Sequence, residues 1–349
     1  MGSATKFAAL NTKIQGMSGK LLKNRDYEQM INLNTVKEVL QYLKESTYYG
    51  EFIFETGGDR GTIEQFEIES RKHLMALNEK LICYTQGVYK EIIMLSFMRS
   101  EVEDLKVYLR HFVRGANRAN ISNIFVAKGK RSSLDYELLN ESVSLEDFID
   151  KLKGTRYHKI LKLYINEEPK KILFYMEMNL DRIYFKAWSD SMMKLKGDEK
   201  EYLMLTIGRN IDFLNIQWIY RGLKYYDLSP EELLNYTLEH GYYFKYKSLK
   251  DLCYSESSEE VIRKIGKSKY GEMFDYEKGL ERFLEIEMER LVYNTTKAMD
   301  KKSNLNILKA VGFIHEVEFE MRDIFTIVEA KRYQLTKEEI KKYLVREIA

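Results

Sequence analysis

The chain has 349 residues, and its 56 Lys and Arg side chains nearly balance 54 Asp and Glu, which leaves a formal net charge of +2. A nucleic-acid-binding domain usually has a strong excess of basic residues, and a solvating tail has a strong excess of acidic residues; this chain has neither excess. Only two prolines occur, Pro169 and Pro230. Because proline breaks helix interiors, their scarcity permits long helices, and we predict an all-α fold.

The cysteines and the apolar runs set further bounds. Cys83 and Cys253 have no Cys or His near them at metal-ligand spacing, which is typical of a reduced cytosolic protein with two ordinary buried thiols. The longest strongly apolar runs, such as Ile92–Leu95, are far shorter than the roughly 18 to 20 residues needed to span a bilayer. We expect any association with a membrane to depend on protein partners.

In chain order, the first clear helix start is Thr35, followed three residues later by Glu38. In such a capping box the hydroxyl and the acid satisfy free backbone N–H groups of a new helix. An apolar ladder with helical spacing follows, formed by Val39, Leu40 and Leu43. The ladder ends in a hydroxyl residue, a variable residue and a tyrosine, at positions 46 to 48.

A second helix pattern follows further along the chain. It begins with an acid and, three residues later, an Asp or Asn, here Glu101 and Asp104, and continues as the ladder Leu105, Tyr108 and Leu109. The glycine-containing stretches at 55–61 and 128–131 are predicted to be exposed turns or loops.

Basic residues recur at four-residue spacing on one face of this second helix, at Arg110, Arg114 and Arg118. One interpretation is a surface for an anionic partner, either a nucleic acid or an acidic protein, helped by the basic loop at 128–131. The other is a solvated face whose arginines pair with acids one or two turns back, Glu101, Glu103 and Asp104. The neutral chain favours the second interpretation, since nucleic-acid binders usually have a net basic domain.

Both patterns occur three times. The capping box returns at Ser144–Asp147 and Ser257–Glu260, with hydroxyl-x-Tyr endings at Tyr157 and Tyr270, and the acid pattern returns at Asp212–Asn215 and Glu320–Asp323. Any amphipathic helix shows such ladders. Successive boxes, however, start 109 and 113 residues apart, and each acid follows its box by 63 to 68 residues. We predict a triplicated helical module, with repeats at residues 1–122, 123–228 and 229–349.

Two more helix starts fit this plan. Ser229-Pro230 with Glu232 combines a capping hydroxyl, a first-turn proline and a closing acid, and Thr336 with Glu339 repeats the box. The aromatic run 242–246 suits either an interface or the core.

A search for catalytic chemistry finds little. No glycine-rich phosphate loop is present, and His315-Glu316 lacks the second histidine of a zinc-protease motif because position 319 is Phe. We predict no catalytic residues, no metal site and no cofactor.

The order of these motifs resembles the C subunit of V/A-type (vacuolar/archaeal-type) ATPases and ATP synthases, a family that includes the d subunit of eukaryotic V-ATPases. The resemblance covers about residues 5 to 345. It rests on the opening segment 11–49 and on the three acid motifs, each with following basic residues, such as Arg110, Arg221, Lys224 and Lys331. The sequence departs from a regular pattern at Glu329, which stands where the second copy has Arg221.

The resemblance implies a funnel of three similar helical bundles in a pseudo-threefold arrangement. It implies a non-catalytic rotor subunit that joins the central stalk (D/F type subunits) to the membrane rotor ring of proteolipids. One copy would sit peripherally on the cytoplasmic side, held by these partners and without inserting into the bilayer or binding nucleic acid. The candidate interface residues are Tyr48, Tyr157, Tyr270, Arg110, Arg114, Arg118, Arg221 and Lys224.

Two alternatives stay open. A helical nucleic-acid-binding adaptor would use the Arg110, Arg114 and Arg118 face and would show steeply salt-dependent binding. An enzyme whose site is assembled from scattered side chains would need a bound cofactor or metal to support it.

Overall fold

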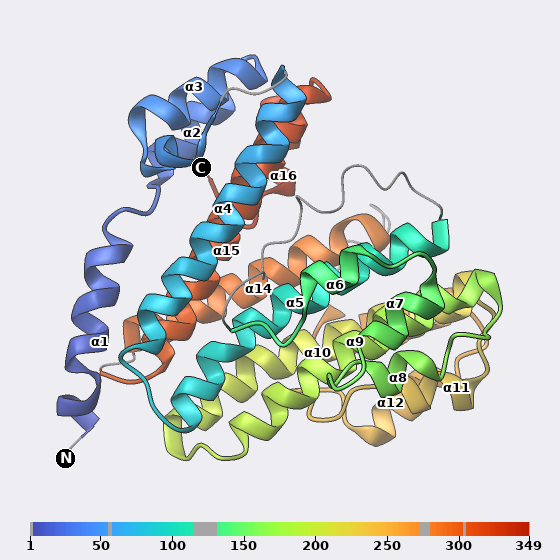
Figure 1. Ribbon diagram of the computed structural model, residues 1–349. Helices are drawn as coiled ribbons and strands as arrows, with labels where there is room; N and C mark the ends of the chain where they lie inside the picture. The colour runs from blue at the N-terminus through green and yellow to red at the C-terminus, as the bar shows by residue number, and fades with distance from the viewer. Residues whose placement is uncertain (1–2, 55–57, 115–130, 272–279, 303–304, 349) are drawn as a thin grey trace. The chain divides into compact units, whose positions relative to one another are not determined.

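The computed structural model describes residues 3–54, 58–114, 131–271, 280–302 and 305–348, and every regular element in these ranges is a helix (Figure 1). The predicted all-α class is confirmed. The chain divides into two compact units. Unit 1 combines both ends of the chain, residues 1–89 and 273–349, and unit 2 comprises residues 90–272.

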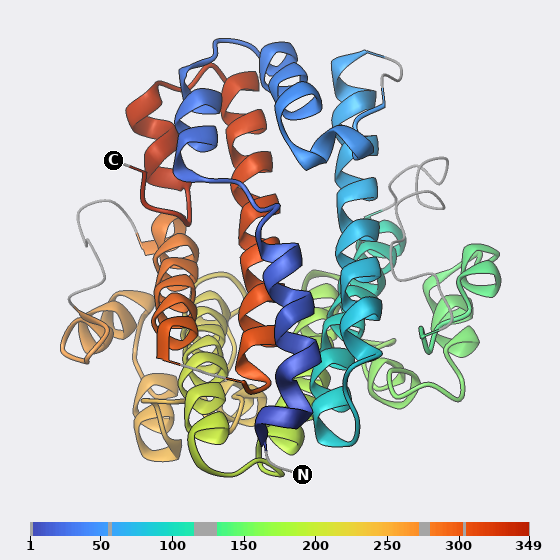
Figure 2. The same cartoon turned by 90° about the vertical axis from the view of Figure 1, so that its left-hand side faces the viewer.

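Unit 1 is organised around a long central helix, α15 (Leu308–Arg332). Figure 2 shows α15 beside α1 (Ser3–Ser18), and it also packs against α4 (Asp59–Ile82) and α14 (Leu280–Lys302). The shorter elements of the unit are α2 (Asn24–Asn32), α3 (Val36–Ser46), the 3-10 helix η1 (Tyr48–Phe52) and α16 (Lys337–Tyr343). Helices from the two chain ends meet directly, because α16 packs against α2 and α15 against both α2 and α3.

Unit 2 contains three long helices, α5 (Val88–Arg114), α9 (Pro169–Met192) and α10 (Gly197–Tyr225). The first two residues of α5 lie in unit 1. The short helices of unit 2 are α6 (Tyr136–Asn140), α7 (Leu145–Lys151), α8 (His158–Lys162), α11 (Pro230–Tyr236), α12 (Tyr246–Cys253) and α13 (Ser258–Gly266). α9 packs against α10, and α10 also contacts α11, α12 and α13.

The predicted capping boxes are confirmed. The hydroxyls of Thr35, Ser144 and Ser257 each accept a hydrogen bond from the backbone N–H three residues later, at the starts of α3, α7 and α13. In all three helices the acid of the box also accepts from the backbone N–H of the residue before the cap. Both prolines lie in the first turn of a helix, where their missing N–H costs nothing.

The predicted apolar ladders face the interior. Leu105 and Leu109 of α5, Ile216 of α10 and Ile324 of α15 are completely buried. So are Val39 of α3 and Phe148 of α7. Each Å² of apolar surface that is buried stabilises the fold by about 25 cal/mol. The buried ladders are therefore the main source of the free energy that holds the helices together.

Two local predictions were wrong. Residues 55–61 are not all loop, since α4 begins at Asp59, directly after Gly58 with its φ of 86°. Cys83 is exposed, because it follows the last turn of α4, whereas Cys253 is buried. The aromatic run 242–246, for which an interface and the core both stayed open, is divided: Phe244 is buried, but Tyr242 and Tyr246 are exposed.

Candidate functional site: three buried acid–tyrosine clusters

The first cluster lies on α5 and is called the α5 cluster. The carboxylate of Glu101 accepts from the Tyr157 hydroxyl at 2.8 Å, from the Ser132 hydroxyl at 2.7 Å, and from the backbone N–H and hydroxyl of Ser133. One turn later the carboxylate of Asp104 accepts from the Tyr136 hydroxyl at 2.8 Å. Both acids are buried, so the two carboxylates fasten the chain segment 132–157 onto α5.

The α10 cluster repeats the arrangement in unit 2. Asp212 accepts from the Tyr270 hydroxyl at 2.7 Å and from the backbone N–H groups of Tyr243 and Phe244 at 2.7 and 3.0 Å. Asn215 exchanges two hydrogen bonds with the backbone of Leu238. The backbone at Gly241 can lie directly against the Asp212 carboxylate because glycine has no side chain. A Cβ on Gly241 would come within 2.2 Å of Asp212 Oδ1.

The α15 cluster joins the two ends of the chain inside unit 1. Glu320 accepts from the hydroxyls of Tyr48 and Tyr49 at 2.9 and 3.0 Å and from the backbone N–H of Leu22 at 2.6 Å. Asp323 accepts from the backbone N–H groups of Val345 and Arg346 at 2.7 and 3.0 Å. The two carboxylates therefore hold the N-terminal segment and the C-terminal tail on the same helix.

The three clusters share one pattern of partners. In each, the first acid binds a tyrosine hydroxyl and at least one backbone N–H group, and the residue three positions later binds a further polar group. The acid of each predicted copy binds the tyrosine of the following copy, and the last acid binds tyrosines of the first copy. The boundaries at 122/123 and 228/229 separate each acid from its tyrosine, and the division into three repeats stays a prediction.

The register of the motif in the first copy is one residue later than its spacing predicted. The hydroxyl of Thr47 accepts from the Tyr49 backbone N–H, as Thr155 does from Tyr157 and Ser268 from Tyr270. Tyr49 is therefore the counterpart of the other two tyrosines, and like them it is buried, whereas Tyr48 is half-buried.

Burial makes the carboxylates of Glu320, Asp323 and Asp212 costly to ionise. It raises the pKa of Glu320 to about 7, although the Tyr48 hydroxyl, the Leu22 N–H, the Tyr49 hydroxyl and the charge of Arg346 all act in the opposite direction. Burial likewise raises the pKa of Asp323 to about 6 and that of Asp212 above its usual value. Removing a carboxylate from water costs free energy that its hydrogen bonds only partly return.

Removing single tyrosine hydroxyls tests the clusters. Tyr49→Phe, Tyr157→Phe and Tyr270→Phe each keep the ring but leave a buried acid short of one donor, so each should lower the free energy of unfolding by about 1–3 kcal/mol. Urea unfolding followed by circular dichroism measures the loss. Tyr246→Phe is the matched control, since Tyr246 is 69% exposed and should change stability by less than about 0.5 kcal/mol. Three losses no larger than the control would mean that the hydroxyl bonds contribute nothing.

Glu320 should also make stability depend on pH. Because the pKa of Glu320 is about 7 in the folded chain and ordinarily about 4.5, the folded state retains a proton that the unfolded state has lost between these pH values. The stability that this group contributes is complete below about pH 4.5 and is lost as the pH rises through about 7. Asp323, with its pKa of about 6, acts with the same sign.

The comparison between wild type and Glu320→Gln isolates the Glu320 contribution. Glutamine does not titrate, so the stability advantage of the wild type over the variant should shrink from pH 5 to pH 8, by at most about 3 kcal/mol. Urea unfolding of both proteins at four pH values gives the difference, and Glu28→Gln, at an exposed position of α2, is the control. A difference that grows with pH would show that the folded pKa is lowered, not raised.

The basic residues predicted for an interface have mixed environments. Arg110 Nε lies 2.6 Å from Glu177 Oε1 of α9, so Arg110 does not pair with Glu101 or Asp104, whereas the charge of Glu103, the third acid predicted, does act on Arg110. Those two acids face the interior, where hydroxyl and backbone groups satisfy them. Arg114 is exposed at the end of α5, and Arg118 and residues 128–130 lie outside the described residues.

The last turns of α10 carry the other two predicted basic positions. Arg221 and Lys224 are both exposed, and Lys224 Nζ donates to the Tyr220 hydroxyl at 2.8 Å. Tyr157 and Tyr270, by contrast, are buried in their own clusters. All eight positions stay predictions as interface residues.

Metal ligation and membrane insertion find no support in the described ranges. No group of three or more His, Cys, Asp or Glu side chains there is arranged to hold a metal ion. Nor is any of the helices described both long enough and apolar enough to span a bilayer.

Comparison with known proteins identifies the family of this chain. The model of the ATP synthase (C/AC39) subunit family matches residues 10–343. The C subunit of the A-type ATP synthase of Methanococcoides burtonii is 24% identical over 349 residues, which cover 99% of this chain and 95% of the relative. The C subunits of the A-type ATP synthases of Methanosarcina mazei and Methanocaldococcus jannaschii are 21% and 23% identical, covering 98% and 97% of this chain and 93% and 86% of theirs.

Fold and clusters together define a helical protein whose buried acids hold its own helices in place. The chain belongs to the ATP synthase (C/AC39) subunit family, as the sequence motifs predicted. Family membership also confirms the prediction of a non-catalytic subunit that is part of an ATP-driven or ATP-synthesising complex.

Proposed function

We propose that this chain is the coupling subunit of a V/A-type rotary ATPase, the socket that joins the central stalk to the membrane rotor ring on its cytoplasmic side. Membership of the ATP synthase (C/AC39) subunit family over residues 10–343 is the observation that carries the proposal. The partners of the socket would be central-stalk subunits of D/F type and the proteolipids of the ring, with one copy of this chain in each complex.

The acid–tyrosine clusters suit a part that transmits torque. A coupling subunit has to resist shear between its helices, and buried carboxylates that bind two or more donors fix the position of one segment against another. In the α15 cluster Glu320 alone holds three donors from residues 22 to 49. Regular helices add stiffness through their backbone hydrogen bonds and close packing.

We further propose that each cluster marks one of three similar helical bundles in a pseudo-threefold funnel. Its broad concave side would receive the foot of the central stalk, and its other side would sit on the ring. A low-resolution electron microscopy map of the chain in its complex tests this arrangement. A three-lobed outline with a central opening is expected, and an elongated or two-lobed outline would contradict it.

Binding to the two partners tests the function directly. The purified full chain should bind isolated central-stalk subunits and the detergent-solubilised ring, and should hydrolyse no ATP alone. The double variant Arg221→Glu/Lys224→Glu should weaken one of these contacts if the predicted basic positions lie at an interface. Lys153→Glu/Lys159→Glu is the matched control at exposed positions of unit 2. Failure of the folded wild-type chain to bind either partner would refute the proposal.

The alternative of a nucleic-acid-binding adaptor makes the opposite prediction. Its affinity for DNA or RNA would fall steeply with salt, whereas the socket should bind neither at physiological salt. The net charge of +2 and the ion pair between Arg110 and Glu177 both disfavour a phosphate-binding face.

A further inference from the structure

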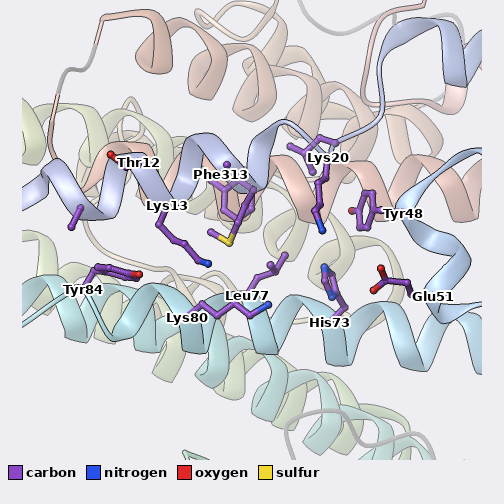
Figure 3. Close-up of a pocket in the computed structure, with 14 residues that line it drawn as sticks. Thr12, Lys13, Lys20, Tyr48, Glu51, His73, Leu77, Lys80, Tyr84 and Phe313 are labelled. Carbon is purple, nitrogen blue, oxygen red and sulfur yellow. The ribbon is translucent and has the colours of Figure 1, made fainter.

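Unit 1 contains a groove that Tyr48 of the α15 cluster also lines. It has a volume of about 640 Å³ and lies along α1 and α4, with Phe313 of α15 among its lining residues. Figure 3 shows Lys13 reaching from α1 toward Lys80 of α4, and Lys20, just beyond α1, pointing toward His73. Pockets of about 300–1,000 Å³ are typical of small-molecule sites, whereas a protein interface needs a much wider surface.

The charge inside the groove is unbalanced. Three lysines line it and Glu51 is the acid among its lining residues, which gives a net charge of +2 with His73 neutral. In the part of the chain that the structure describes, none of the side-chain ammonium groups of Lys13, Lys20 and Lys80 makes an ion pair or hydrogen bond. Lys13 is half-buried, and Lys20 and Lys80 are exposed, so all three ammonium groups can be reached by an anion from solution.

His73 lies among these charges. Burial is the largest cause that lowers the pKa of His73 below its usual value, the charges of Lys80 and Lys20 lower it further, and the charge of Glu51 acts in the opposite direction. A bound dianion would neutralise the two ammonium groups that lie near the neutral imidazole of His73. The N–H group of that imidazole would then serve the dianion as a further hydrogen-bond donor.

The rest of the lining offers apolar side chains, which a hydrocarbon portion of a ligand could contact, and hydroxyl groups, which could donate hydrogen bonds. Leu77 and Phe313 are buried, and Met17 lines the groove as well. The hydroxyl residues Thr12 and Tyr84 lie at the end of the groove opposite His73 and Glu51 (Figure 3). A ligand that combined an anionic group with an apolar or ring portion would use both kinds of surface.

We propose that the groove between α1 and α4 binds an organic phosphate monoester, with the phosphoryl dianion held by Lys13, Lys20 and Lys80 and the carbon portion lying on Leu77 and Phe313. A charge of −2 on the ester matches the net charge of the lining. The same chemistry is offered by a soluble metabolite and by the headgroup of a phosphatidic acid, so the experiment distinguishes these two sources.

Isothermal titration calorimetry of the full chain at low salt provides the test. The probes are AMP, dihexanoylphosphatidic acid below its micelle concentration, and inorganic phosphate. At least one ester should bind more tightly than inorganic phosphate, by about tenfold or more, because only an ester can contact the apolar surface of the groove. Tighter binding of AMP would indicate a soluble ligand, and tighter binding of the phosphatidic acid would indicate a lipid.

Two variants assign the binding to this groove. Lys13→Gln/Lys80→Gln should weaken ester binding by about tenfold or more, since charge-assisted hydrogen bonds are lost, while Lys37→Gln/Lys342→Gln, on exposed positions of unit 1, should leave it within about twofold. Gly16→Leu should fill the groove without unfolding α1, because no atom lies within 4 Å of a Cβ built there. That variant should weaken the esters by about tenfold and inorganic phosphate by much less.

Three results would overturn the proposal. The first is no binding of any probe at millimolar concentration by a chain that is folded by circular dichroism. The second is equal binding of inorganic phosphate and the esters, which would mean only a diffuse attraction of anions. The third is binding of hexaglutamate that Lys13→Gln/Lys80→Gln abolishes while the esters do not bind, which would make the groove a docking surface for an acidic protein segment. None of these results bears on binding to the central stalk.

Discussion

Glu320→Ala is expected to lower the free energy of unfolding by about 3–5 kcal/mol, the largest effect of any single cluster residue. The change removes the acceptor that three donors share: the half-buried Tyr48 hydroxyl, the buried Tyr49 hydroxyl and the backbone N–H of Leu22. Each unsatisfied buried group costs about 1–3 kcal/mol, and the lost side-chain volume adds a cavity. Because Glu320 is 1% exposed, water cannot readily replace the carboxylate.

Urea unfolding at pH 5, where most of the stability contributed by Glu320 is still present, measures the effect of Glu320→Ala. The control is Glu28→Ala on the exposed side of α2, which should change stability by less than about 0.5 kcal/mol. Hydrogen exchange adds a local readout, since loss of the α15 cluster should release η1 and the segment around Leu22 before the rest of unit 1. A variant as stable as the control, with unchanged exchange at Leu22, would show that Glu320 does not join the chain ends.

The helix starts were predictable from sequence because capping is local. At Thr35, Ser144 and Ser257 the hydroxyl, the acid and the backbone groups that they bind all lie within a few residues, so spacing alone identifies them. The ladders behind them were predictable for the same reason, since helical periodicity decides which side chains share a face.

The burial of the acids has a signal in the sequence that the prediction of a solvated face overlooked. Glu101 precedes Leu105 by four residues and Tyr108 by seven, which places all three on one face of α5. An acid on the apolar face of a helix is carried into the interior with it, and there it needs donors. Glu101 therefore belongs with the apolar ladder and not with the arginines.

The partners of the buried acids could not be predicted in the same way. Tyr48 and Glu320 are separated by 272 residues, and no local spacing connects them. The recurrence of the tyrosine and of the acid indicated that both belong to the repeated module, but only the fold shows that they bind each other. The one-residue shift from Tyr48 to Tyr49 is also invisible in sequence, because two tyrosines and two hydroxyl residues stand side by side there.

Unit 2 contains a second buried charge with a large expected effect. Lys106 of α5 has a side chain that is 10% exposed, and its Nζ lies 2.6 Å from Asp181 Oδ1 of α9 and 3.0 Å from Glu103 Oε1. Burial opposes the charge of Lys106, but Asp181 and Glu103 outweigh it and raise the lysine pKa. Burial also raises the pKa of Asp181 despite the attraction of Lys106, so the acid depends on its lysine to stay ionised.

Lys106→Met should therefore lower the free energy of unfolding by about 3–5 kcal/mol, because it keeps most of the packing but leaves the buried carboxylate of Asp181 without its cation. Lys162→Met breaks an ion pair of similar length with Asp150, at 2.7 Å, and should have a much smaller effect because both side chains of that pair are exposed.

The double variant Lys106→Met/Asp181→Leu separates the loss of attraction from the cost of an unpaired charge. Removing both partners of a buried pair is often close to neutral, so the second change should recover most of the stability that the first one lost. Urea unfolding of the wild type, both single variants and the double variant gives the coupling energy between the two residues. If Asp181→Leu recovered nothing, the cost of Lys106→Met would come from lost packing, and the ion pair would not be what holds α5 against α9.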